Sequence, residues 1–130
     1  MEAMQPPGDL ERFRQTLQEL SCDLGPDGLA EVLASYLADG RRRVEALTEF
    51  LEDGDLEGLG HCAHALKGSS SIFGLIELER AALAVEMASC PPGDAGLGAL
   101  IERLRSCYTA LEPMLRAECP APLPDHRRPE

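Results

Sequence analysis

Apolar residues recur along most of the chain every three or four positions, which is the spacing of one face of an α-helix. This spacing predicts a short first helix that begins near Asp9, with Asp9 as its N-cap, and a break at residues 25–27, Gly-Pro-Asp. A long second helix is expected over residues 28–52. The Asp-Gly pair at residues 39–40 is a point at which this helix is expected to bend or divide.

Three more helices follow in the pattern. One is predicted over residues 56–73, the next has its apolar positions between Leu75 and Val85, and the last carries a stripe from Leu97 to Leu115. Because the connections are short, helices that follow one another in sequence are expected to be antiparallel neighbours. The fold class predicted is therefore all-α: an antiparallel up-and-down four-helix bundle with a short N-terminal helix.

The 130 residues are enough for one hydrophobic core, and a single folded domain is expected. Residues 1–7 lack periodicity and end in two prolines, which predicts a flexible lead. Residues 8–117 contain all the predicted helices and form the bundle domain. Residues 118–130 are polar and rich in proline, so a disordered tail is expected there.

The charge and the cysteines narrow the classes of partner and compartment. The formal net charge is −11, with 23 acidic and 12 basic residues, which argues against a nucleic-acid partner and against binding to an anionic membrane. The five cysteines are an odd number without paired spacing, and no apolar leader or membrane-spanning run is present. We therefore expect a reduced, cytoplasmic protein, with a monomer as the default state.

His64 is the candidate for chemistry. It lies about 130° from the centre of the apolar stripe of its helix and should be exposed. Gly60 and Gly68 stand one turn before and after it, and each costs on the order of 1 kcal/mol of helix stability relative to alanine. We interpret them as docking clearance that lets another protein bring its backbone close to the imidazole. Lys67, the only lysine, would offset negative charge on a phosphoryl group taken up by this nucleophile.

His61 precedes His64 by three residues and is also expected to be exposed. Two histidines at this spacing can share a metal ion, but two ligands are too few. No acidic or thiol group is placed by the sequence to complete the set, so no metal site is predicted. His61 is expected to be a plain surface residue or a contact for a partner.

The segment His64-Ala65-Leu66-Lys67-Gly68-Ser69-Ser70, closed by Gly74, resembles the signature of histidine-containing phosphotransfer (HPt) domains. The resemblance implies a four-helix bundle in which His64 is phosphorylated and exchanges its phosphoryl group with an aspartate of a response-regulator receiver domain. It also implies that Ser69 or Ser71 supports the site or contacts the partner.

The function expected from the residues and the resemblance is that of a phosphocarrier in a multistep two-component phosphorelay, and not a self-contained enzyme. Its partners would be receiver domains, a hybrid sensor histidine kinase, or both. No cofactor is expected on this chain, because the resemblance implies that the receiver holds the Mg²⁺. Two alternatives stay open: a phosphoacceptor module for a chemotaxis-type histidine kinase, and a non-phosphorylated adaptor that binds and inhibits a receiver or kinase.

Overall fold

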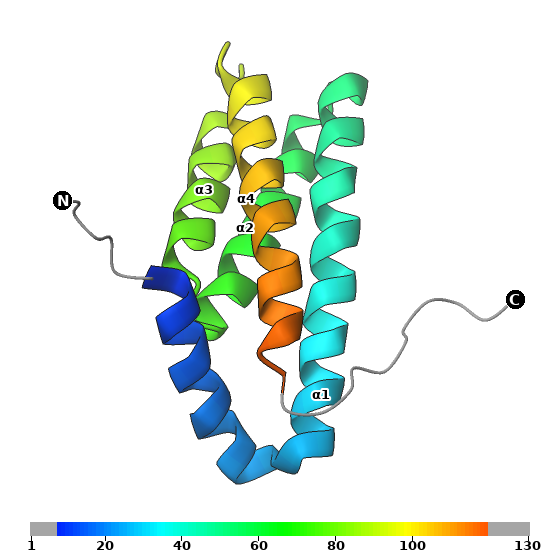
Figure 1. Cartoon of the computed structure of the whole chain (residues 1–130). Helices are drawn as coiled ribbons and strands as arrows, with labels where there is room; N and C mark the ends of the chain where they lie inside the picture. Colours follow the sequence, from blue (N-terminus) through cyan, green and yellow to red (C-terminus); the bar gives the residue numbers. More distant parts are fainter. Residues whose placement is uncertain (1–7, 120–130) are drawn as a thin grey trace, which may run out of the picture.

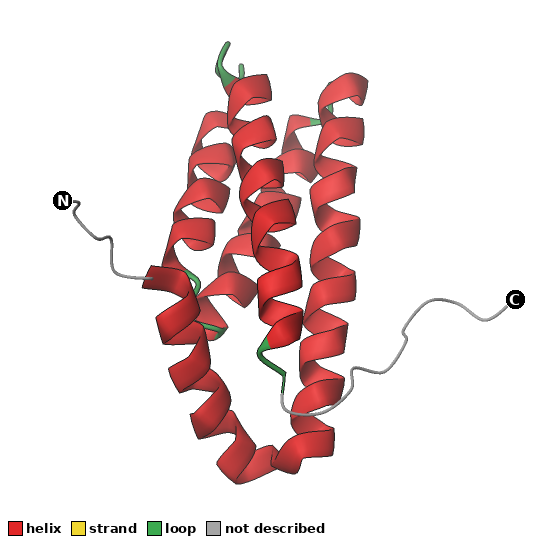
Figure 2. Ribbon diagram, viewed as in Figure 1, coloured by secondary structure: helices red, strands yellow, loops and turns green. Residues whose placement is uncertain are grey.

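The computed structural model describes residues 8–119, so the predicted lead and all but the first two residues of the predicted tail lie outside the described residues. Within this range the chain forms four helices and no strand (Figures 1 and 2). They are α1 (Gly8–Asp53), α2 (Leu56–Ile72), α3 (Ile76–Ala88) and α4 (Leu97–Ala117). The prediction of an all-α fold is confirmed.

Helix α1 contains a kink at the break predicted for residues 25–27. Gly25 has φ 72° and ψ 170°, a backbone conformation that is not helical and that residues with a β-carbon rarely adopt. The kink separates residues 8–24, here called the arm, from the long segment of α1 over residues 26–53. In Figure 1 the arm diverges from the long segment and reaches the first turn of α3.

The bend expected at residues 39–40 is absent, because α1 continues through it without a second non-helical residue. Gly40 instead makes room for a side chain of α4. A β-carbon at Gly40 would lie 2.9 Å from the ring of Tyr108, whose hydroxyl donates a 2.6 Å hydrogen bond to the carbonyl of Leu37. The missing β-carbon therefore allows α1 and α4 to pack closely around a buried tyrosine.

We expect Gly40→Leu to destabilise the bundle by about 1–3 kcal/mol, because the new side chain would overpack against Tyr108. Gly98→Ala in α4 is the matched control, since a β-carbon there makes an ordinary 3.8 Å contact with Leu51. The control should be neutral or stabilising by up to about 1 kcal/mol. Urea denaturation measures both, and equal stability of the two variants would contradict this account of Gly40.

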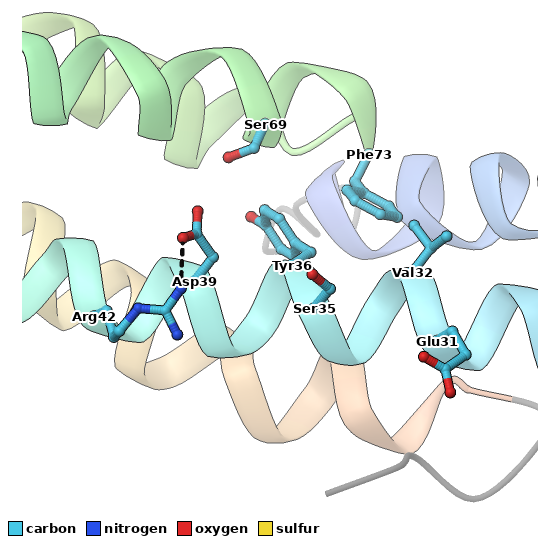
Figure 3. A pocket seen from close by; sticks show the side chains of 8 residues that line it. All are labelled: Glu31, Val32, Ser35, Tyr36, Asp39, Arg42, Ser69 and Phe73. Carbon is cyan, nitrogen blue, oxygen red and sulfur yellow. Dashed lines mark hydrogen bonds and ion pairs between the residues drawn. The ribbon is translucent and has the colours of Figure 1, made fainter. Parts of the chain in front are cut away.

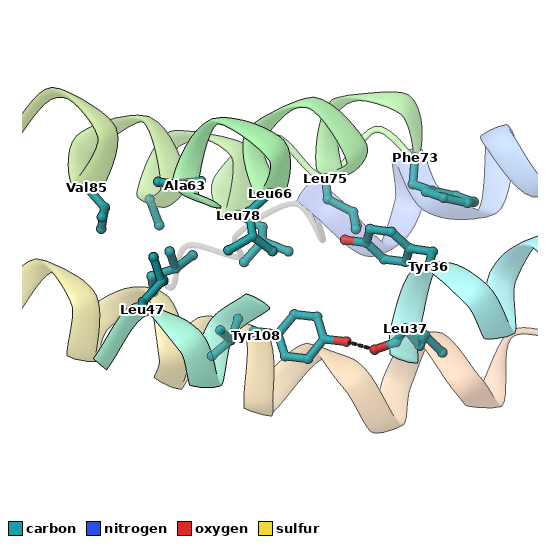
Figure 4. Packing of buried hydrophobic residues seen from close by; sticks show 14 of the residues in the cluster. Tyr36, Leu37, Leu47, Ala63, Leu66, Phe73, Leu75, Leu78, Val85 and Tyr108 are labelled. Carbon is teal, nitrogen blue, oxygen red and sulfur yellow. Dashed lines mark hydrogen bonds between the residues drawn. The ribbon is translucent and has the colours of Figure 1, made fainter. Parts of the chain in front are cut away.

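The core is formed by side chains from all four helices, as Figure 4 shows for part of it. In α2 the inward positions are Leu59, Ala63 and Leu66, each with no exposed surface. Burying these three residues fixes the rotation of α2 about its axis. His64, one position after Ala63, is therefore turned outward.

Asp9 does not cap its own helix as predicted. It lies inside α1, and its buried carboxylate accepts hydrogen bonds from the backbone N–H groups of Glu77 and Leu78, at 2.9 Å and 3.3 Å. These groups belong to the first turn of α3, whose own N-cap residue, Leu75, provides no side-chain hydrogen bond. The arm thus supplies the cap that α3 lacks.

Glu118, predicted to begin the disordered tail, is instead the C-cap of α4. Its carboxylate accepts two hydrogen bonds of 3.0 Å from the guanidinium of Arg14 in the arm. The helical bundle, with the C-cap of α4, therefore reaches one residue past its predicted end, and Glu118 there pairs with the arm.

Candidate functional site

His64 lies on the outer face of α2, as predicted, and 63% of its side chain is exposed. Its imidazole Nδ1 lies 2.9 Å from Oε2 of Glu86 in α3. Oε1 of the same carboxylate lies 3.2 Å from Nζ of Lys67, one turn along α2 from His64. Glu86 of α3 therefore contacts both candidate site residues of α2.

Glu86 was not predicted as a site residue. It directly follows Val85, the last residue of the apolar stripe of α3, and so lies at the edge of the buried face. An acidic residue at the edge of a buried helix face is a candidate for a contact with the adjacent helix, because its side chain is long enough to reach that helix. The residue of α2 that Glu86 contacts depends on the axial register of α3 against α2. The sequence alone does not give this register.

The charge state of Glu86 fixes the hydrogen bonding of His64. Partial burial raises the pKa of the Glu86 carboxyl, but the interactions with Lys67 and His64 outweigh it and hold that pKa below its ordinary value. The carboxylate is therefore ionised at neutral pH and can only accept hydrogen bonds. In the neutral imidazole Nδ1 must carry the proton, which leaves the lone pair of Nε2 free.

Lys67, the predicted source of positive charge at the site, has an acidic partner of its own. Its ammonium pairs with Glu86, on the side of His64 that α3 covers. The contact is an ion pair and not a hydrogen bond, since its orientation leaves Glu86 Oε1 without a hydrogen-bond partner among the described residues. The positive charge of Lys67 is thus close to His64 and is balanced by the Glu86 carboxylate.

The two glycines beside His64 have different surroundings. A β-carbon at Gly68 would meet nothing within 4 Å, so this flank is open. A β-carbon at Gly60 would lie 2.8 Å from the hydroxyl oxygen of Ser89, a buried residue at the C-cap of α3. Gly60 allows close packing of α2 on α3, which contradicts its prediction as docking clearance.

A groove runs between α1 and α2, and the α2 residues that line it include His61, three positions before His64. It consists of two hollows, of about 450 and 540 Å³, which share Asp39 and Arg42. Figure 3 shows the first hollow, with Val32 and Phe73 at one end and Asp39 with Arg42 at the other. Val32 is 40% exposed and Ile72, next to Phe73, is 67% exposed, so this end presents apolar surface.

The second hollow is basic. Arg42 and Arg43 both pair with Asp39, at 2.9 and 2.7 Å, and His61 lies beside them as a lining residue from α2. Residues 41–43 are three consecutive arginines. The first of them, Arg41, does not line the groove and pairs instead with Glu112 of α4. The basic run is therefore divided between two faces, and only two of its three arginines lie in the groove.

The three serines after Gly68 have separate roles. The hydroxyl of Ser69 donates back to the carbonyls of Ala65 and Leu66 in its own helix, at 3.2 and 3.3 Å. Ser70 is buried and shares a 3.3 Å hydrogen bond with the hydroxyl of Tyr36. Ser71 is exposed. No contact joins Ser69 or Ser71 to His64 or Lys67 among the described residues, so their support of the site stays a prediction.

Two further features bear on binding. Among residues 8–119 no group of three or more histidine, cysteine or acidic residues is arranged to hold a metal ion. In the same range no helix is long and apolar enough to cross a membrane.

The site thus consists of an exposed imidazole, one nitrogen of which is hydrogen-bonded to a carboxylate, on a helix of an all-α bundle. The Hpt domain family model matches residues 31–113, well over half of the chain. The chain belongs to the Hpt domain family, whose members carry out histidine phosphotransfer in two-component signalling and interact with receiver domains and kinases. No curated protein and no solved structure matches the chain.

Proposed function

We propose that this protein carries a phosphoryl group on Nε2 of His64 between aspartates of receiver domains, in a multistep phosphorelay. The observation that carries the proposal is the hydrogen bond from Nδ1 of His64 to Glu86, which leaves Nε2 as a free, exposed nucleophile. Membership of the Hpt domain family supports the role of a phosphocarrier and not that of a self-contained enzyme.

In the proposed step the Nε2 lone pair attacks the phosphorus of an aspartyl phosphate. The bond between phosphorus and the aspartyl oxygen breaks, and its electron pair stays on the aspartate carboxylate. The imidazole ring becomes positively charged as the N–P bond forms, and the Glu86 carboxylate, 2.9 Å from Nδ1, stabilises that charge. Mg²⁺ on the receiver would neutralise the phosphoryl oxygens, and Lys67 would add its charge once the group is on His64.

The structure supports one direction of approach for the receiver. Glu86 and Lys67 occupy the α3 side of His64, whereas Gly68 and the groove leave the α1 side open. The apolar end of the groove, at Val32, would accept apolar side chains, and Arg42 with its neighbours would face acidic residues of the receiver. His61 lines this groove and is proposed as a partner contact.

Glu86→Ala should slow phosphorylation of His64 roughly ten- to a hundredfold, the effect of losing a hydrogen bond to a charged group. Glu86→Gln keeps an acceptor for Nδ1 but loses the charge, so we expect a smaller defect. Rates from rapid quenching with one phosphorylated receiver measure both. Wild-type rates in Glu86→Ala would contradict the assigned role of the carboxylate.

The relay is tested by mixing the protein with a panel of ³²P-labelled receiver domains and Mg²⁺, then adding a second, unlabelled receiver. Label that reaches the protein and passes on to the second receiver supports the proposal. Label obtained only from a kinase domain with ATP would assign the protein as a phosphoacceptor module for that kinase. No label from either source would favour the non-phosphorylated adaptor.

The proposal also covers the topology of the bundle, the cellular compartment and the oligomeric state. The short turn between α2 and α3 supports the antiparallel up-and-down order of the bundle. The five cysteines are all free, which supports a reducing, cytoplasmic compartment. We propose a monomer, whose mass in solution is measured by light scattering.

A further inference from the structure

The arm, residues 8–24, lies outside the part of the chain that the Hpt family model matches, yet it makes specific contacts with the turn between α2 and α3. Nε of Arg12 donates a 3.1 Å hydrogen bond to the carbonyl of Gly74 in that turn. The Asp9 carboxylate caps the first turn of α3 through Glu77 and Leu78. The two arm residues are also paired with each other at 3.0 Å.

The arm also packs tightly against this turn. Gly74 has φ 72°, and a β-carbon there would lie 3.1 Å from the β-carbon of Arg12. Phe13 of the arm is fully buried, and its ring centroid lies 5.9 Å from that of Phe73. The arm therefore holds the turn and the start of α3 by hydrogen bonds at two places, Gly74 and the first turn of α3, and by close packing at Gly74 and Phe73.

This turn connects the two helices that build the site. Helix α2 carries His64 and Lys67, and α3 carries Glu86, so the 2.9 Å hydrogen bond at His64 depends on the axial register of α3 against α2. A shift of one residue along a helix is about 1.5 Å, which is enough to break a hydrogen bond of this length. Whatever fixes the start of α3 therefore also fixes the partner of Nδ1.

We propose that Asp9 is a positioning residue for His64, acting through α3. By capping α3, the arm holds Glu86 in register with His64, keeps the proton on Nδ1 and keeps Nε2 free. The inference rests on the proposed phosphorylation of His64 and adds to it a segment that the family model does not include.

The test compares Asp9→Ala, which removes the cap, with Asp9→Asn, whose amide oxygen can still accept from a backbone N–H. Arg14→Ala is the control, because Arg14 is also an arm residue but pairs with Glu118 at the end of α4. The first measurement is the imidazole tautomer of His64 in ¹⁵N-histidine-labelled protein, by long-range ¹H–¹⁵N correlation. His61, in the same helix, is the internal reference.

The second measurement is the rate at which phosphoramidate phosphorylates His64. In this reaction Nε2 attacks phosphorus, the P–N bond breaks and ammonia leaves with the bonding electrons. No receiver is needed, so a failure of the relay proposal is seen separately, as an absence of transfer from receivers to wild type.

We expect Asp9→Ala to lose the single Nδ1–H tautomer of His64 and to slow phosphoramidate labelling by about three- to tenfold. Asp9→Asn and Arg14→Ala should keep the tautomer and most of the rate, and His61 should not change in any variant. If Asp9→Ala does not fold at the assay temperature, Arg12→Met, which removes the bond to Gly74, takes its place. A wild-type tautomer and rate in the folded variant, or an equal loss in Arg14→Ala, would overturn the proposal.

Discussion

His64→Gln should abolish phosphoryl uptake, with labelling from any phosphorylated receiver reduced by at least about a thousandfold, to the background of the assay. The glutamine amide is no nucleophile at neutral pH, so the loss should be complete and not partial. The fold should survive, because the His64 side chain is 63% exposed and contributes little burial. The midpoint of thermal unfolding should stay close to that of the wild type.

The matched control for this variant is His61→Gln. His61 is an exposed histidine of the same helix, but it faces the groove beside Arg42 and Arg43 and has no bond to Glu86. It should still accept the label, with a modest loss in receiver affinity. Labelled His64→Gln together with unlabelled His61→Gln would show that the phosphorylated residue was assigned wrongly.

Gly68→Gln should reduce transfer from a receiver by at least about tenfold while the bundle stays folded. A β-carbon at Gly68 meets nothing within 4 Å in this structure, so the new side chain has room in the free protein. Replacing glycine by glutamine in a helix also gains a few tenths to about 1 kcal/mol of stability. The side chain would project beside His64 into the space that the receiver needs.

Phosphoramidate distinguishes docking from chemistry in this variant. Gly68→Gln should be labelled by phosphoramidate at the wild-type rate, because this small donor does not need the docking surface. Gly60→Ala offers the opposite case: its β-carbon would meet Ser89, so its defect should appear in stability first. Normal receiver transfer in Gly68→Gln would refute the clearance argument for Gly68.

The sequence predicts well those features that depend on local periodicity. The apolar stripe around Ala63 and Leu66 sets the rotation of α2, and it correctly turns His64 to solvent. The break near Gly25 was likewise predictable, because glycine and proline act on the backbone at their own positions.

The contacts that the sequence missed join residues far apart in the chain. Glu86 reaches a histidine 22 positions earlier, and Asp9 caps a helix turn 68 positions later. Such pairs depend on how helices are placed against one another, and a single sequence does not give that placement.

The roles of the helical glycines also depend on contacts that a single sequence does not give. Gly40, Gly60 and Gly68 are all helical glycines, and only their neighbours in space distinguish them. Tyr108 packs closely against Gly40, and Ser89 packs closely against Gly60, whereas Gly68 faces open space. The surroundings differ from the prediction at Gly40 and Gly60, whereas at Gly68 the flank is open and its role in docking stays a prediction.

Phosphorylation of His64 is tested most directly by locating the phosphoryl group on the wild-type protein after transfer from a receiver with Mg²⁺. We expect a label that is labile to acid and stable to base, located on His64 by mass spectrometry and assigned to Nε2 by NMR. A label on His61, on Nδ1 of His64, or on a hydroxyl would contradict this expectation.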